Sequence, residues 1–165
     1  MAAKDNFENL YRILETHNVY ATNEFKQDIL KLVKTDINKF VSDFYRYFSR
    51  ENLKDYHKYE RLVLTKRQNT QLDGHSLFRF EYRNTSNLRC IYMLQNENNI
   101  KETILLCAFK EDNSKKKGKD AYGTNIEKAI SIYQKYKDIF IIISKMFLYN
   151  KYLRTISMQF LAFAK

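Results

Sequence analysis

The stretch that decides the fold is SLFRFEYRNTSNLRCIYML, residues 76–94. Two short runs of aromatic, β-branched and aliphatic residues, SLFRFEY and LRCIYML, flank the polar segment RNTSN. Residues of these types favour strands, and a short Asn-rich segment between two such runs is typical of a hairpin loop. The sequence therefore predicts an antiparallel β-hairpin here.

Two more runs of the same character flank this hairpin, RLVLT at 61–65 and ETILLCAF at 102–109. The polar segment QNENNI precedes the last run, so the last three of the four predicted strands should form an antiparallel meander. With a turn at residues 98 and 99, Cys90 and Cys107 fall opposite each other on neighbouring strands. The sequence predicts either two small buried thiols at this place or a regulatory disulfide.

Helices precede the predicted sheet. The first should begin near Asp5, a favourable N-cap residue, and carry apolar residues on one face. The second should run from Thr22 to Phe48 as one long amphipathic helix, because apolar residues recur there with a period near 3.6 over about seven turns. Residues 50–59 fit either a short helix or a loop.

A further helix is predicted after the sheet. Within GTNIEKA, Thr124 and Glu127 have the spacing of a capping box, so this helix should begin at about residue 125. The tail to residue 165 should continue as helix. Apolar side chains of the first part should lie along the sheet, at Ile126, Ala129, Ile130, Tyr133, Tyr136 and Phe140.

Together these elements predict an α+β fold with N-terminal helices, a four-stranded and mainly antiparallel sheet, and C-terminal helices. A length of 165 residues fits one domain, and the sequence holds no linker-like or repeated segment. We expect a single domain over residues 1–165. It should consist of a helical part at 1–58, a core at 59–137 and a helical extension at 138–165.

The charge balance favours a polyanionic partner. The chain carries 29 Lys and Arg against 19 Asp and Glu, a formal net charge of +10. Nucleic acid, an acidic membrane surface and an acidic protein would all be attracted, and charge alone does not choose among them. The most apolar stretch, residues 138–149, is interrupted by Lys145 and is shorter than the ~20 residues needed to cross a bilayer. With no secretory signal at the N-terminus, we expect a cytoplasmic protein that does not enter a membrane.

Most familiar catalytic patterns are missing from the sequence. His17, His57 and His75 are scattered, and none has a His, Cys or carboxylate at metal-ligand spacing on a shared helix face. There is no Gly-rich phosphate loop, no nucleophile elbow and no dinucleotide fingerprint. We expect neither a metal nor a cofactor.

Basic residues gather in the strands and just after them. Arg79 and Arg83 belong to the second predicted strand, and Lys110 ends the fourth. A guanidinium among apolar neighbours, as at Arg89 in the third strand, needs an anion or a carboxylate within reach, and Glu81 on the adjacent strand is one candidate. The loop that follows is either a solvated charge run or a binding segment, and it adds Lys115, Lys116, Lys117 and Lys119.

Three pieces of the sequence, in order, resemble the RelE/ParE superfamily of bacterial toxins, and within it the HigB-like and phage-derived branch. The pieces are the strand pair SLFRFEYRNTSNLRCIYML, the strand and basic loop ILLCAFKEDNSKKKGKD, and the helix IEKAISIYQKY. The resemblance covers residues 77–136. It implies a small α+β domain, the toxin of a type II toxin–antitoxin system, that cleaves mRNA in the ribosome without a metal and is masked by a cognate antitoxin. Some relatives poison DNA gyrase instead.

The resemblance also implies roles for individual residues. Arg89 matches the strand arginine of the family motif, and its fixed charge suits a phosphorane dianion. Lys110 matches the basic residue after the last strand, and Arg79 and Tyr122 complete the implied catalytic set. The implied contacts to nucleic acid are Arg83, Lys115, Lys116, Lys117 and Lys119.

The chain departs from the family pattern at the basic loop. The usual proline is missing, Glu111 and Asp112 interrupt the basic run, and Cys107 stands where the branch often has histidine. These departures leave open an inactive relative, of phage or mobile-element origin, that binds nucleic acid or an acidic protein. The additional helices leave open a built-in antitoxin mimic, a homodimer surface or a larger core.

Overall fold

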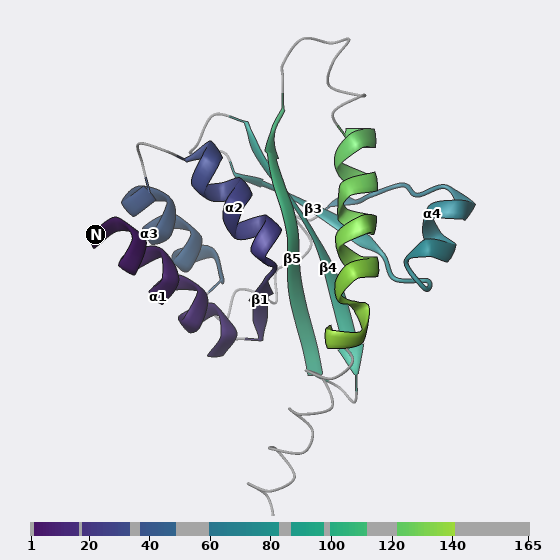
Figure 1. The fold of residues 1–165 in the computed structure, drawn as a ribbon, viewed down its shortest axis with the longest axis horizontal. Coiled ribbons are helices and arrows are strands. Elements are labelled where there is room, and N and C mark those ends of the chain that lie inside the picture. The colour runs from purple at the N-terminus through teal and green to yellow at the C-terminus, as the bar shows by residue number, and fades with distance from the viewer. Residues whose placement is uncertain are drawn as a thin grey trace, which may run out of the picture. The chain divides into compact units, whose positions relative to one another are not determined.

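The structure, a computed structural model, describes residues 2–16, 18–33, 37–48, 60–82, 87–97, 100–111 and 122–140. The chain forms two compact units, residues 1–133 and 134–165. The first unit holds helices packed on a mixed sheet, which confirms the predicted α+β class (Figure 1). The prediction of a single domain stays a prediction.

Within the described ranges the sheet has five strands in the order β1-β5-β4-β3-β2. β3, β4 and β5 pair antiparallel, so the predicted meander is confirmed. β1 pairs with β5 in parallel and was not predicted. The strands are β1 (Val19–Ala21), β2 (Glu60–Arg61), β3 (Leu77–Tyr82), β4 (Leu88–Glu97) and β5 (Ile100–Lys110).

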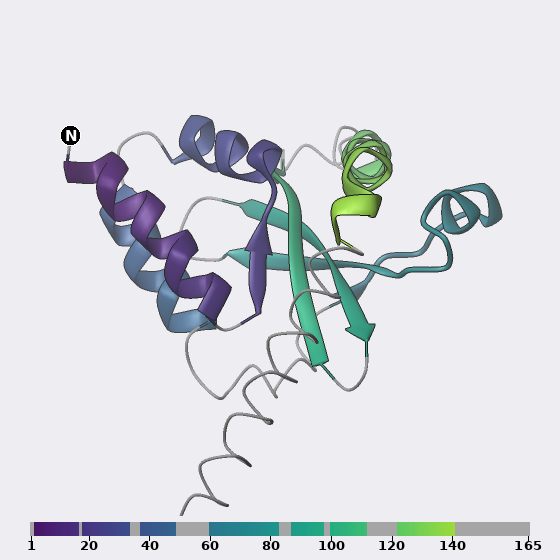
Figure 2. The ribbon, with the colours of Figure 1, turned by 60° about the horizontal axis from the view of Figure 1, so that its bottom comes forward.

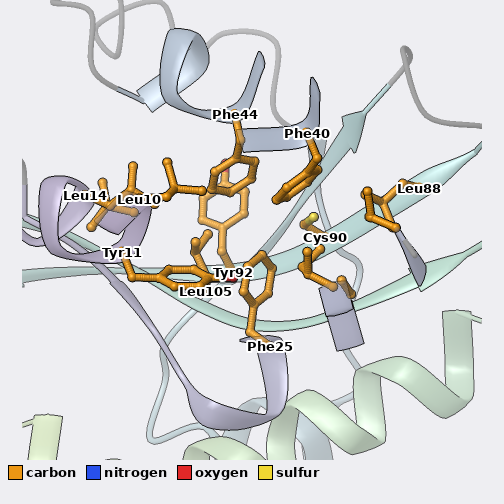
Figure 3. Packing of buried hydrophobic residues seen from close by; sticks show 14 residues of the cluster. Leu10, Tyr11, Leu14, Phe25, Phe40, Phe44, Leu88, Cys90, Tyr92 and Leu105 are labelled. Atoms are coloured by element: carbon orange, nitrogen blue, oxygen red, sulfur yellow. The ribbon is translucent and has the colours of Figure 1, made fainter. Parts of the chain in front are cut away.

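Three helices cover one face of this sheet. They are α1 (Ala2–Thr16), α2 (Asn23–Leu32) and α3 (Ile37–Phe48) (Figures 1 and 2). Tyr11 from α1, Phe25 from α2 and Phe44 from α3 are buried with Tyr92 of β4 in one cluster (Figure 3). Alternate residues of a strand point to opposite faces, so Leu88, Cys90 and Tyr92 define the face of β4 that lies on these helices.

The helix over residues 122–140 covers the opposite face as far as residue 133, where the first unit ends (Figure 2). The Sγ atom of Cys107 in β5 lies 3.7 Å from the carbonyl oxygen of Asn125 in this helix. Ile126, Ala129, Ile130 and Tyr133 are buried, as the sequence predicts. In the second unit the rings of Tyr136 and Phe140 contact each other, with centroids 6.1 Å apart.

A β-bulge interrupts the β4–β5 ladder. Tyr92 pairs with Leu105 while Ile91 pairs with Cys107, so Leu106 is an extra residue in β5. From Glu97 and Ile100 up to the bulge, the register is the one expected for a turn at residues 98 and 99. Beyond the bulge every residue of β5 is displaced by one position, which exchanges the two faces of the strand.

Side chains of α2 cover the edge of β5 beyond the short strand β1. Thr22 caps α2, since its Oγ1 accepts a hydrogen bond from the Phe25 amide at 3.2 Å, and it donates to the carbonyl of Leu106 at 2.8 Å. Asp28 accepts a hydrogen bond from the backbone N–H of Ala108 at 3.1 Å. The same carboxylate lies 2.6 and 2.7 Å from Nζ of Lys128 in the 122–140 helix. Asp28 therefore joins α2, the edge of β5 and the helix on the opposite face.

The N-terminal helices differ from their prediction in two ways. The predicted helix from Thr22 to Phe48 is two helices, because α2 ends with Val33 as its C-cap and α3 begins at Ile37. Residues 34–36 lie outside the described ranges, and their sequence includes Thr35 and Asp36, which favour caps over helix interiors. The predicted cap at Asp5 is also wrong, because α1 begins at Ala2.

The segment between β2 and β3 corrects a strand prediction. Glu60 and Arg61 pair with β3, and the Leu62 N–H donates to the carbonyl of Leu77 at 2.9 Å, whereas Thr65, in the predicted strand 61–65, caps a short helix, α4 (Lys66–Gln71). Thr65 and Gln68 form a full capping box. Residues 50–59, residues 83–86 and the tail beyond residue 140 lie outside the described residues, and so do the predictions made for them.

The predicted capping box at Thr124 and Glu127 is wrong. The helix begins at residue 122, so Thr124 already lies inside it. The Glu127 carboxylate instead accepts a hydrogen bond from Nε2 of Gln68 at 2.8 Å and lies 3.6 Å from Arg67 of α4. The capping-box spacing is thus used by Thr65 and Gln68, whereas Glu127 connects the 122–140 helix to α4.

We predict that Asp28→Ala lowers the free energy of unfolding by about 2 kcal/mol, because it leaves the buried Ala108 N–H and the Lys128 ammonium without their partner. Lys128 is more than one-third exposed, so the ion pair contributes the smaller part. In a thermal melt the midpoint should fall by roughly 5 °C. Glu8→Ala is the control: it removes a more exposed carboxylate, 3.9 Å from Lys26, and should shift the midpoint little.

Candidate functional site

Two of the predicted arginines share the sheet face that the helical residues 122–133 cover. Arg79 pairs with Ile91, and Arg89 lies two residues before Ile91 on the same strand, so both arginines belong to one face. Phe109, which pairs with Arg89, lies on that face too. The Tyr122 ring meets Phe109 edge-on, with centroids 5.1 Å apart. Three of the four predicted catalytic residues, Arg79, Arg89 and Tyr122, therefore gather on one side of the sheet.

Arg89 forms an ion pair within the chain. Its Nη2 lies 2.6 Å from Oε2 of Glu111, and its side chain is only 10% exposed. Its Nη1 lies 3.5 Å from the carbonyl oxygen of Leu88, the outer limit of a hydrogen bond. The predicted carboxylate partner, Glu81, pairs with Arg89 in the backbone register, while its side chain lies outside the described atoms. Among the described side chains, Glu111 provides a carboxylate to Arg89.

Arg79 and Tyr122 form a stacked pair. The guanidinium carbon of Arg79 lies 5.2 Å from the centre of the Tyr122 ring, within cation–π range. The Tyr122 hydroxyl is buried and has no hydrogen-bond partner within the described part of the chain. The Tyr122 ring therefore contacts both a cation and the perpendicular Phe109 ring, and its hydroxyl is shielded from solvent.

Lys110 does not join this group. It pairs with Leu88, whose side chain packs on the N-terminal helices, so Lys110 belongs to the face opposite Arg89 and its side chain is exposed. The cause is the bulge at Leu106. Without the extra residue Lys110 would occupy the face of Arg89, and with it Glu111 takes that place, its backbone N–H donating to the carbonyl of Asn87 at 2.9 Å.

The remaining predicted binding residues lie outside the described residues. They are Arg83, Lys115, Lys116, Lys117 and Lys119. Their contacts with nucleic acid stay a prediction.

The two cysteines are buried free thiols on opposite faces of the sheet. Cys90 pairs with Ala108 and packs with the N-terminal helices, whereas Cys107 pairs with Ile91. The prediction that they lie directly opposite each other is wrong, because the bulge displaces Cys107 by one position. Burial raises the pKa of both thiols, that of Cys107 to about 12 although the Lys128 ammonium lowers it. Protonated, buried thiols are poor nucleophiles and poor metal ligands.

A polar cluster that the sequence analysis did not predict connects the turn after α4 to the 122–140 helix. The Tyr133 hydroxyl donates a 3.0 Å hydrogen bond to Asp73, and the ring of His75 lies 5.6 Å from the Tyr133 ring. Burial, then the bond to Asp73, raises the pKa of Tyr133 to about 12. A detectable sequence signal was the Thr65–Gln68 capping spacing, which marks the helix that precedes this cluster.

Comparisons with protein families, with curated proteins and with solved structures find no match to this chain. In the described ranges, no three His, Cys, Asp or Glu side chains come together as a metal site would require. Over the same residues, each helix falls short of the length and apolar character that a bilayer crossing needs.

We predict that neither thiol reacts with a thiol-specific aromatic disulfide reagent in the native protein at pH 8, because both pKa values lie well above that pH. In denaturant both thiols should react.

The raised pKa of Cys107 also makes the free energy of unfolding depend on pH. Its contribution is complete below the unfolded value of 9.0 and is lost as the pH rises toward about 12, so Cys107→Ala should flatten the stability profile over that range. Rapid labelling of the native protein at pH 8 would contradict the predicted lack of thiol reactivity.

Proposed function

We propose that this protein is a nucleic-acid-binding relative of the RelE/ParE toxins that holds its ligand without cleaving it. The observation that carries the proposal is the Arg89–Glu111 ion pair. The residue that the family resemblance assigns to the phosphorane has its charge balanced by a carboxylate at 2.6 Å and is 8% exposed as a residue. A cation in that state does not stabilise new negative charge on a substrate.

Proton transfer is also poorly supported at this face. Cleavage by a 2′-hydroxyl requires groups that accept and donate protons within hydrogen-bond reach of the substrate. Glu111 is paired with Arg89, the Tyr122 hydroxyl is buried, and the Cys107 thiol has a pKa of about 12. The face has cations and an aromatic ring, which suit binding, whereas the candidate acids and bases among the described side chains are occupied or enclosed.

The charge distribution supports binding. Acidic and basic residues are nearly balanced over the described ranges, so most of the net charge of +10 belongs to the other segments. The densest of these is the run with four lysines between Lys115 and Lys119, which follows β5 and precedes the 122–140 helix. Lys110, exposed at the end of β5, adds one more cation next to that run. Closely spaced lysines bind phosphates by releasing condensed counterions, without sequence preference.

An mRNA-cleaving toxin is the second candidate. The observation that favours it is the gathering of Arg79, Arg89 and Tyr122 on one face of the sheet. For cleavage, Glu111 would have to leave Arg89 and the N-terminal end of the 122–140 helix would have to admit RNA. A cognate antitoxin and the ribosome would then be the partners.

To test binding, anisotropy of labelled single-stranded RNA and duplex DNA should be measured over a range of salt concentrations. We predict that replacing Lys115, Lys116, Lys117 and Lys119 by Ala weakens binding and lowers the salt slope by up to about 3 for single-stranded RNA, because each lost phosphate contact removes ~0.7. A charge-matched control replaces exposed cations elsewhere, namely Arg12, Lys31, Lys39 and Lys66. Equal losses in both variants, or binding only to an acidic protein, would contradict the proposal.

To test cleavage, the protein should be induced in bacteria and the ends of translated messages mapped. The binding proposal predicts normal growth and intact mRNA. Growth arrest with fragmented messages that Arg89→Ala relieves would establish the toxin instead, provided that the variant accumulates to the wild-type level. Arg89→Ala leaves the Glu111 carboxylate without its cation, so circular dichroism of the purified variant must accompany this comparison.

A further inference from the structure

The start of α2 contacts the bulge in β5 from the edge of the sheet. Oγ1 of Thr22 lies 2.8 Å from the carbonyl oxygen of Leu106 and 3.2 Å from that of Leu105. The Thr22 N–H also donates to the Leu105 carbonyl, at 3.0 Å. In a regular strand the carbonyls of consecutive residues face opposite edges, so one side chain reaches both only where the strand is bulged. Thr22 therefore contacts a feature that regular pairing would not present.

Asp28 makes a second contact of this kind. Its carboxylate accepts a hydrogen bond from the Ala108 N–H at 3.1 Å, and its side chain is only 13% exposed. Regular pairing would turn the Ala108 N–H toward β4 and present the N–H of Cys107 at the edge instead. The N-cap residue and one side chain of α2 thus bind backbone groups that the bulge brings to this edge.

The polarity of the side chains in β5 does not choose between the bulged and the regular register. A slip by one residue is normally resisted because it moves buried apolar side chains to the solvent. The four residues after Leu105 are all apolar and at most 7% exposed: Leu106, Cys107, Ala108 and Phe109. A slip here exchanges one buried apolar side chain for another, so the register depends on side-chain volume and on contacts from outside the strand.

The regular register would bring the two cysteines together. From the turn to the pair of Tyr92 and Leu105, the observed register is that of regular pairing, and its continuation sets Cys107 opposite Cys90. Directly opposite residues have Cα atoms roughly 4.5 to 5.5 Å apart, which is within the range for a disulfide. In the bulged register the thiols lie on opposite faces of the sheet and cannot be bridged without backbone movement.

We propose that α2 selects the register of the end of β5 through Thr22 and Asp28. With both contacts present the strand is bulged, and loss of either shifts it toward the regular register, in which Cys107 lies opposite Cys90. The Arg89–Glu111 pair lies beyond the bulge, so it follows from the register that α2 selects. The proposal does not depend on the proposed function, because the register is measured without a ligand.

The test is to refold the full chain in a mixture of reduced and oxidised glutathione and to analyse the peptides with Cys90 and Cys107 by mass spectrometry. The two thiols lose their hydrogen atoms to form the disulfide, while oxidised glutathione is reduced to its thiol form. Thr22→Val keeps the shape of the side chain and removes the hydroxyl. At equilibrium its ratio of disulfide to free thiols should exceed that of the wild type roughly tenfold, as expected when the hydrogen bonds of one side chain are lost.

Three further variants separate the bulge contact from other effects. Thr22→Ser retains the hydroxyl and should keep the wild-type ratio. Thr65→Val removes the same type of N-cap from α4 instead of α2, and should also keep that ratio. Asp28→Ala removes the second contact and should raise the ratio as Thr22→Val does, which keeps the test open if Thr22→Val does not fold.

NMR spectra of the reduced proteins report the register directly. The wild type should show cross-strand nuclear Overhauser contacts between Cys90 and Ala108, and a contact between Cys90 and Cys107 should appear in Thr22→Val. The wild-type ratio and wild-type contacts in both Thr22→Val and Asp28→Ala would overturn the proposal. An equal rise of the ratio in Thr65→Val would also overturn it, since lost stability would then be the cause. The same holds if Glu111→Gln alone changes the register, because the ion pair would then hold it.

Discussion

The carboxylate of Asp28 holds together the three layers of the first unit. It extends from α2, accepts the amide of Ala108 at the edge of β5, and meets Lys128 of the helix that covers the far side of the sheet. An exposed sheet edge leaves backbone groups without partners and invites pairing with other chains. Here β1 pairs with three residues of β5, from Thr103 to Leu105. Beyond them, Thr22 donates a hydrogen bond to the Leu106 carbonyl and Asp28 accepts one from the Ala108 N–H. The helix that lies over Arg79 and Arg89 is positioned partly through this contact.

The sequence predicted the elements whose signal is local. The runs at 76–82, 88–94 and 102–109 became β3, β4 and β5, because alternating and β-branched residues between polar loops determine strands from within the segment. It did not predict β1, since three residues, Val19 to Ala21, carry no periodicity of their own and become a strand only by pairing with β5. The division between α2 and α3 was missed because the apolar period continues across it, so the cap-favouring residues Thr35 and Asp36 were not recognised.

The candidate site could be predicted in its members but not in its arrangement. The family resemblance grouped Arg79, Arg89 and Tyr122 as one set, and the structure places all three on one side of the sheet. Lys110 was expected beside them, and Glu111 was noted only as an interruption of a basic run. Both positions depend on whether β5 keeps its alternation past Tyr92, and nothing in ILLCAF shows a bulge. Counting residues from the turn assumes regular pairing, so it cannot detect an extra, unpaired residue such as Leu106 in β5.

The bulge at Leu106 therefore determines whether the charge next to Arg89 at the end of β5 is positive or negative. One residue, and so a single codon, determines whether the end of β5 presents an ammonium or a carboxylate to Arg89. In a sheet with regular pairing, changing the charge of a site requires a change of side chain at that site. Here a deletion or insertion several residues away would do the same while every functional side chain kept its identity. Related chains could thus differ in the charge of this face without differing at any position that a comparison of site residues would inspect.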